Sequence, residues 1–155
     1  MKSNITIIDW SNTCNYKKVN GLFLLTNDVY LTFQFGPFLY EIIIEKGALT
    51  DGLSVPRIFR WYLPAWNDNN VLYNISGIVH DGIYGSEILS KSFADTLFHQ
   101  SLITAGISKR KANIALWCVE NLAGLRYGRD KDDFDIAPFV RLKMGNISLV
   151  EHSVR

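Results

Sequence analysis

The chain has 155 residues, of which 48% are hydrophobic and 13% aromatic, and its formal net charge is +1 at pH 7. This length suits one domain with its own core, and the composition favours a packed globule over a disordered chain. The near-zero charge excludes a global attraction to nucleic acid or anionic membranes, although a local basic patch remains compatible with it. No apolar run approaches the roughly 20 residues of a membrane span, and Met1–Ile8 lacks a signal-peptide core. The two cysteines, Cys14 and Cys118, fit no metal or redox spacing.

The first third of the chain predicts an antiparallel β-meander of about three or four strands. Val29–Phe35 alternates strictly, with Val29 and Phe33 on one face and Tyr30 on the other, which is typical of a half-buried strand. The polar stretch Ser11–Asn20 predicts a loop, and Asn27–Asp28 a two-residue turn. The expected strands are Ile5–Trp10, Gly21–Thr26, Val29–Phe35 and Phe38–Glu45.

Beyond Pro56, apolar residues recur at spacings of three and four, which predicts about four helices. Pro56 suits the first turn of the first helix, and Pro64 stops that helix. Serine suits three of the caps, and Asp68 or Asn69 suits that of the second helix. From cap to end, the expected helices are Ser54–Leu63, Asp68–Asp81, Ser90–Gly106 and Ser108–Gly124.

The whole pattern predicts one α+β domain over residues 1–155, in which a small N-terminal β-meander packs against the helices. The β-rich part covers 1–49 and the helical part 54–128. The C-terminal part, 129–155, begins with the charged loop Arg129–Asp135 and contains two strand candidates, Phe139–Leu142 and Ile147–Val150.

His80 and Asp81 form the most informative pair. An imidazole carries a proton near neutral pH and is the commonest metal ligand, and a nearby carboxylate can orient it or bind the same ion. Neighbours on a helix point about 100° apart, so the two reach one pocket only at a helix end, which Gly82 suggests. The alternative is that His80 is a hydrogen-bonded core or cap residue and Asp81 binds local backbone.

Two further acids extend this group. Asp51 stands between a strand end and a helix start, where an Asx-turn and a site residue are both typical. Asp95 lies at the margin of a buried helix face, with His99 four positions on, and such a pair is also a common surface feature. Asp51, His80, Asp81 and Asp95 together suit a divalent metal such as zinc, with His80, Asp81 and Asp95 as ligands, although their spacing matches no H-E-x-x-H pattern.

Hydroxyl and basic residues offer other chemistries. Ser54 and Tyr84 can supply hydroxyls, but Ser54 lacks the glycine-flanked turn of a nucleophilic serine. Arg57 with Arg60, and the run Lys109–Lys111, suit an anionic partner or ordinary solvation. The chain has no P-loop or dinucleotide-binding glycine pattern.

Three motifs taken together resemble a known family. T-D-G-x-S-V-P-R begins at Thr50, H-D-x-x-Y at His80 and S-K-x-x-A-D-x-x-F at Ser90. Over residues 20–127 the chain resembles domain-of-unknown-function family 1353 of phages and prophages. Leu53 departs from the small residue of many relatives, and His99 is not part of the pattern. The resemblance implies one compact α+β domain of phage or prophage origin, and it implies no established activity.

The leading functional hypothesis is a small phage-encoded hydrolase-like domain, with or without a divalent metal, that acts on a cell-wall peptide or a nucleotide. His80 is expected as general base or ligand, and the carboxylates as ligands or orienting groups. Four motif residues are predicted to contact the substrate: Ser54, Arg57, Tyr84 and Lys91.

Two non-enzymatic hypotheses stand beside it. In a virion structural or interaction protein, Asp51, Ser54, His80 and Asp95 form a buried hydrogen-bond network, and the aromatic residues near Trp61 and Trp66 form the contact surface. In a binder of host signalling or defence molecules, the basic residues contact an anion. We expect the protein in the host cytoplasm or the virion, with virion proteins or a host factor as partners and its oligomeric state open.

Overall fold

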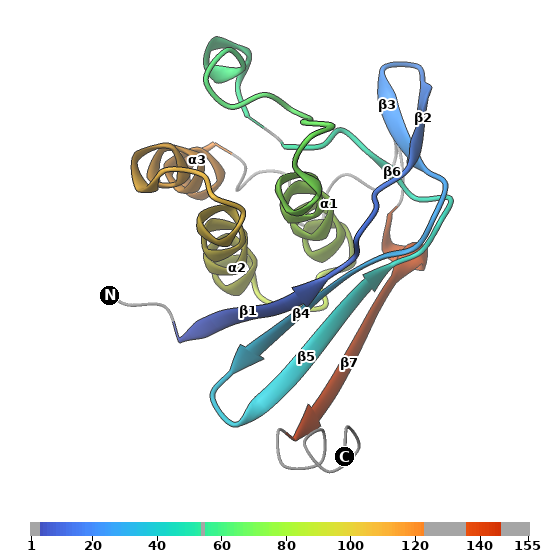
Figure 1. Ribbon diagram of the computed structural model, residues 1–155, viewed down its shortest axis with the longest axis vertical. Coiled ribbons are helices and arrows are strands. Elements are labelled where there is room, and N and C mark those ends of the chain that lie inside the picture. Colours follow the sequence, from blue (N-terminus) through green and yellow to red (C-terminus); the bar gives the residue numbers. More distant parts are fainter. Residues whose placement is uncertain (1–3, 54, 123–135, 147–155) are drawn as a thin grey trace.

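The computed structural model describes residues 4–53, 55–122 and 136–146. Within these ranges it has two antiparallel sheets and three α-helices (Figure 1). The larger sheet has the order β1 (Ile5–Trp10), β4 (Val29–Phe35), β5 (Phe38–Ile44) and β7 (Val140–Asn146). The smaller sheet has the order β2 (Tyr16–Val19), β3 (Leu22–Leu25) and β6 (Leu49–Thr50).

The four predicted strands are confirmed, with β1 at an edge of its sheet, but their arrangement differs from a simple meander. β1 pairs with β4 and not with its sequence neighbour, and β3 belongs to the smaller sheet. Asn27–Asp28 therefore changes the chain from one sheet to the other and does not close a hairpin. The Asn27 side chain holds this corner, since its Oδ1 accepts the N–H of Asn15 at 2.6 Å.

The prediction of a loop over Ser11–Asn20 is wrong, because this stretch contains β2. The aromatic ring of Tyr16 lies edge-on to Phe23, at 5.1 Å between centroids, and to Trp66, at 4.8 Å. These contacts join segments distant in sequence. A polar sequence such as Tyr16–Val19 becomes a strand here through tertiary packing, which local pattern does not reveal.

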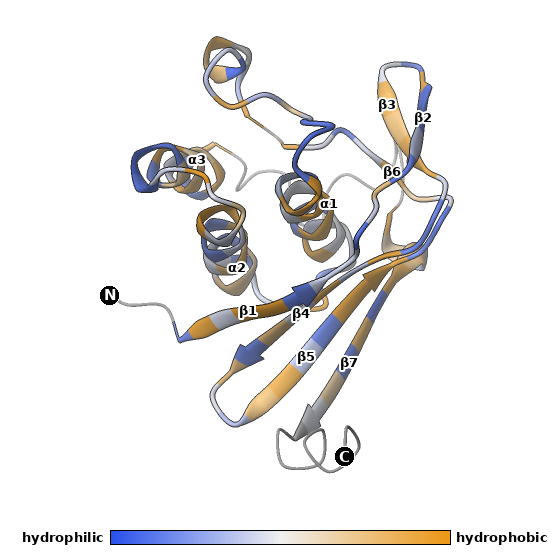
Figure 2. Cartoon of the chain, in the orientation of Figure 1, coloured by the Kyte–Doolittle hydropathy of each residue, from blue (hydrophilic) through white to orange (hydrophobic). Residues whose placement is uncertain are grey.

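The predicted alternation in β4 positions the core. Val29, Leu31 and Phe33 are buried, whereas Phe35 shares their face but is 39% exposed at the strand end. α1 (Val71–Ser86) and α2 (Lys91–Thr104) pack on this face of the larger sheet, and α3 (Lys109–Asn121) packs on α2 (Figure 1). The hydropathy colours of β5 show no such alternation, because this strand is orange towards both ends and pale to blue in the middle (Figure 2).

The helices are α1 (Val71–Ser86), α2 (Lys91–Thr104) and α3 (Lys109–Asn121), so there are three and not four in the described part of the chain. The segment predicted as the first helix contains only a single 3-10 turn, Arg57–Phe59. Pro56 and Pro64 bound it too closely for a helix to propagate. Ser90 and Ser108 cap α2 and α3 as predicted, but the cap of α1 is Asn70, one or two residues later than expected.

α1 continues past the predicted end at His80 and Asp81 to Ser86. Gly82 does not stop it. The missing side chain instead lets the helix approach the sheet, because a Cβ atom at Gly82 would lie 2.7 Å from Cδ1 of Ile44. Glu87, in the left-handed conformation, ends the helix. His80 and Asp81 are therefore interior helical residues, whose side chains diverge.

The C-terminal strand candidate Phe139–Leu142 corresponds to β7, which begins one residue later. Arg129–Asp135 and Ile147–Val150 lie outside the described residues. Among the described helices, none has the length and apolar character to cross a membrane.

Candidate functional site

His80 and Asp95 meet between α1 and α2. His80 Nε2 lies 2.8 Å from Asp95 Oδ1. The two residues are only 4% and 2% exposed, and the imidazole also packs against Phe98, with ring centroids 4.8 Å apart. Two residues that the sequence separates by a loop thus form a buried polar contact between two helices.

The Asp95 carboxylate is the centre of a small network, which we call the Asp95 cluster: His80, Tyr84, Lys91 and Asp95. The Tyr84 hydroxyl donates to Oδ1 at 2.5 Å, and Lys91 Nζ donates to Oδ2 at 2.7 Å. Lys91 Nζ also donates to the carbonyl oxygen of Val119 on α3, at 3.3 Å. One carboxylate therefore joins α1 to α2, and its lysine partner joins α2 to α3.

The protonation of the pair follows from burial and these contacts. Burial lowers the pKa of His80 and outweighs the opposing effects of Asp95 and Asp51, so the imidazole is neutral at pH 7. Burial alone would raise the pKa of Asp95, but hydrogen bonds from His80, Lys91 and Tyr84 hold that pKa below its ordinary value. The charged Asp95 carboxylate then accepts a hydrogen bond from the Nε2–H group of the neutral imidazole.

Stability is therefore expected to decrease as the pH falls from about 7 to 5. The unfolded chain binds a proton on His80 near its ordinary pKa of about 6.5, whereas the folded chain binds it only at lower pH. Below about pH 6.5 the unfolded state therefore holds more protons, and the contribution of His80 to stability is lost as the pH falls towards its folded pKa. Urea denaturation across this range measures the slope.

The variant His80→Gln should flatten this slope, since an amide does not titrate but retains an N–H donor for Asp95. His99→Gln is the matched control: His99 is half-buried on α2 and bonds to Asn113, at 2.8 Å. An unchanged slope in His80→Gln, or a flattened slope in the control, would contradict the assignment to His80. The contribution of Asp95 to stability is present above about pH 3.9 and is lost only in more acidic solution. It therefore does not mask the slope that His80 causes.

Asp81 points to the other side of α1. Its Oδ2 accepts the hydroxyl of Thr50, at 2.7 Å, and Thr50 is fully buried at the end of β6. The structure thus brings His80 together with Asp95, and Asp81 together with Thr50, in two separate contacts. α1 is tied through them to α2 on one side and to the smaller sheet on the other.

The T-D-G turn is shaped by close backbone approach. The Thr50 hydroxyl oxygen accepts the N–H of Gly52, at 3.1 Å, and Leu53 N–H donates to the carbonyl of Ala65, at 2.9 Å. A Cβ atom at Gly77 would lie 2.9 Å from the backbone of Gly52, so α1 also packs directly on the turn. Asp51 is half-buried here, and its charge favours protonation of His80.

The remaining predicted residues divide by position. Tyr84 and Lys91 contact Asp95, while Ser54 and the side chain of Arg57 lie outside what the structure describes. The described residues contain no group of three or more His, Cys, Asp or Glu side chains that could hold a metal ion. The catalytic, substrate-binding and metal-binding roles stay predictions.

Sequence reasoning gave Thr50 no role of its own, although the T-D-G motif contains it. A signal existed, since a threonine at the end of a short strand commonly turns its hydroxyl to nearby polar groups. Two cavities, of about 730 and 380 Å³, were also not foreseen, and none of Asp51, His80, Asp81 and Asp95 lines either of them.

The fold and these contacts define a class of protein: a small α+β domain in which three sequence motifs meet around one buried helix. A family profile described as "Protein of unknown function (DUF1353)" matches residues 28–119. This match covers more than half of the chain, and the chain belongs to that family. No curated protein and no solved structure matched the chain.

Proposed function

We propose that this protein is a non-enzymatic docking domain, in which the motif residues brace the fold and the segment 56–66 binds a partner. We call this segment the aromatic loop. The observation that carries the proposal is the exposure of two large apolar side chains at its tip, 83% for Trp61 and 72% for Ile58. Large apolar side chains that are exposed to solvent and do not pack on the core mark interaction sites.

The base of the aromatic loop is firmly attached, which supports a docking role over a loose connection. Leu63 is buried, Leu53 N–H donates to Ala65 O at 2.9 Å, and the Tyr73 hydroxyl donates to Pro64 O at 2.5 Å. The tip is thus presented from a fixed base, so that little conformational freedom is lost on binding.

Trp66 has a different part from the one expected. Its ring stacks on Phe23 at 4.3 Å between centroids and contacts Tyr16, so it anchors the loop to the smaller sheet. The contact surface on this proposal is therefore the tip alone, where Arg60 is exposed beside Trp61.

The burial of the Asp95 cluster supports the bracing role of the motif. Asp95 accepts three donors and connects two helices directly, and fully satisfied polar networks of this kind specify one packing arrangement. A virion assembly or a bacterial host component is the first partner to test, given the phage association that the resemblance implies.

A hydrolase remains the second candidate, favoured by one observation. The Asp95 carboxylate holds Nε2 of His80 at 2.8 Å, and a carboxylate that orients an imidazole is a common feature of a general base. A neutral imidazole oriented in this way offers its Nδ1 lone pair as a base. A folded His80→Gln variant that loses a hydrolytic activity of the wild type, towards peptidoglycan fragments or nucleotides, would favour this candidate.

The docking proposal is tested by a double variant, Ile58→Ser with Trp61→Ser. Because both side chains are almost fully exposed, we expect the melting temperature to stay within about 2 °C of the wild type. Binding of the tagged full chain to a fraction of a bacterial lysate, soluble assemblies or membranes, is expected to decrease at least tenfold, measured by co-sedimentation.

Met144→Ser is the matched control, since Met144 is also well exposed but lies on β7 of the larger sheet. The proposal fails if the wild type binds no fraction. It also fails if the double variant binds as well as the wild type, or if Met144→Ser loses binding equally.

A further inference from the structure

We infer that the aromatic loop docks on an anionic lipid surface. This inference rests on the proposed function and names the partner of that same site. The loop sequence P-R-I-F-R-W-Y-L-P-A-W contains two arginines and no acidic residue. Its tip therefore combines apolar side chains with positive charge, as peripheral membrane-binding segments do.

The adjacent end of α3 extends the positive charge. Lys111 Nζ lies 4.6 Å from the centroid of the Tyr62 ring, and the Tyr62 ring contacts Trp61, at 5.3 Å between centroids. Lys109 and Arg110 are exposed in the same first turn, which contains no acidic residue. Positive charge at a helix N-terminus interacts unfavourably with the helix dipole. Attraction between these basic side chains and an anionic surface offsets that cost.

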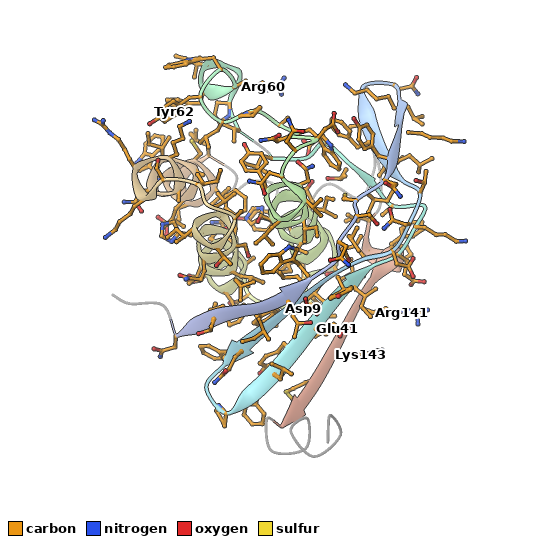
Figure 3. All side chains as sticks on the ribbon, in the orientation of Figure 1. Asp9, Glu41, Arg60, Tyr62, Arg141 and Lys143 are labelled. Carbon is orange, nitrogen blue, oxygen red and sulfur yellow. The ribbon has the colours of Figure 1, made fainter. Side chains whose placement is uncertain are left out.

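The aromatic loop carries charge of one sign, whereas the larger sheet carries both signs. Figure 3 shows Arg60 and Tyr62 on the aromatic loop. The acidic Asp9 and Glu41 lie with the basic Arg141 and Lys143 on the larger sheet, at the other side of the molecule. The net charge of the chain is only +1, so the attraction comes from this local cluster and orients the loop towards the membrane.

The geometry of the tip favours lipid over a protein partner. Ile58 and Trp61 are 72% and 83% exposed. The segment between β6 and α1, which contains them, lies at the edge of the fold (Figure 1). A bilayer interface surrounds such exposed side chains on all sides. Tryptophan prefers the depth of this interface, with its ring in the apolar region and its N–H near the headgroups. The neighbouring Tyr62 is half-buried and contacts Trp61, at 5.3 Å between ring centroids.

The experiment uses the full chain with unilamellar vesicles of phosphatidylglycerol mixed equally with phosphatidylcholine, and with vesicles of pure phosphatidylcholine. At low salt we expect sedimentation with the anionic vesicles, at least tenfold weaker binding to the neutral ones, and loss of binding at high salt. Arg60→Gln and Lys111→Gln should each weaken binding about fivefold, the equivalent of one cation near the surface.

Tryptophan fluorescence then locates the inserted residue. On binding anionic vesicles, the emission of the wild type should shift to shorter wavelength. Trp61→Phe should bind but lose most of the shift, whereas Trp117→Phe, which changes another exposed tryptophan on α3, should keep it. A shift that persists in Trp61→Phe would overturn the inference.

Absence of binding to anionic vesicles, or equal binding to both kinds, would also overturn it. If the chain fails to bind vesicles but binds a protein assembly from lysate through Ile58 and Trp61, the docking function stands and the partner is a protein. If the chain binds neither, the docking function itself fails.

Discussion

Replacing Gly52 with alanine is expected to lower the free energy of unfolding by about 4 kcal/mol or more, which few point substitutions do. Two causes combine. Gly52 has φ +77°, a conformation that costs a non-glycine residue roughly 1–2 kcal/mol. A Cβ atom there would also lie 2.2 Å from the carbonyl oxygen of Ala65. That oxygen accepts the Leu53 N–H, so it cannot move without breaking a hydrogen bond at the base of the aromatic loop.

Gly21→Ala separates the two causes. Gly21 has a similar φ of +80°, but a Cβ atom there would meet nothing within 4 Å. Its cost should therefore be the conformational one alone, about 1–2 kcal/mol. Urea denaturation of both variants gives the difference, which measures the close approach of the T-D-G turn to Ala65. Equal losses in the two variants would show that this approach is not what requires glycine.

Local signals explain what the sequence predicted well. The serine caps of α2 and α3 depend on a side chain and the backbone three residues later, so sequence alone locates them. The alternation of Val29, Leu31 and Phe33 likewise reflects the pleat of a single strand. Neither feature requires knowledge of which segments meet.

The errors have the opposite origin, because each depends on contacts between distant segments. β2 forms a strand because Tyr16 packs on Trp66. α1 continues through Gly82 because the helix packs closely on the sheet there, with Ile44 in the space that a side chain would fill. From the local sequence pattern alone, a polar stretch is predicted as a loop and a glycine as the end of a helix. Tertiary packing overrides both.

The helix end predicted before Gly82 is the reason why His80 and Asp81 were expected at one site. With the helix ending at His80 and Asp81, both side chains could enter one pocket, as the hydrolase hypothesis requires. In a helix that continues to Ser86 they diverge, so that His80 bonds to Asp95 and Asp81 to Thr50. The residues singled out for their chemistry do make the polar contacts of the fold, but in two places.

Asp95→Ala is expected to have the other large effect, a loss of about 3–5 kcal/mol, the range for removing one partner of a buried charged contact. The carboxylate accepts two donors that are themselves buried, His80 Nε2 and the Tyr84 hydroxyl. Without it these groups keep their desolvation cost and lose their hydrogen bonds. Lys91 contributes less, because at 29% exposure its ammonium group regains water.

A second substitution distinguishes lost hydrogen bonding from lost packing. In the Asp95→Ala background, Tyr84→Phe removes a hydroxyl that has lost its Asp95 acceptor, whereas in the wild type it removes a working donor. Tyr84→Phe should therefore destabilise the wild type by about 1–2 kcal/mol and cost clearly less in the Asp95→Ala background. Equal costs in both backgrounds, measured by urea denaturation, would mean that the Tyr84–Asp95 hydrogen bond does not brace α1 against α2. His80 would then be the contact that remains between Asp95 and α1.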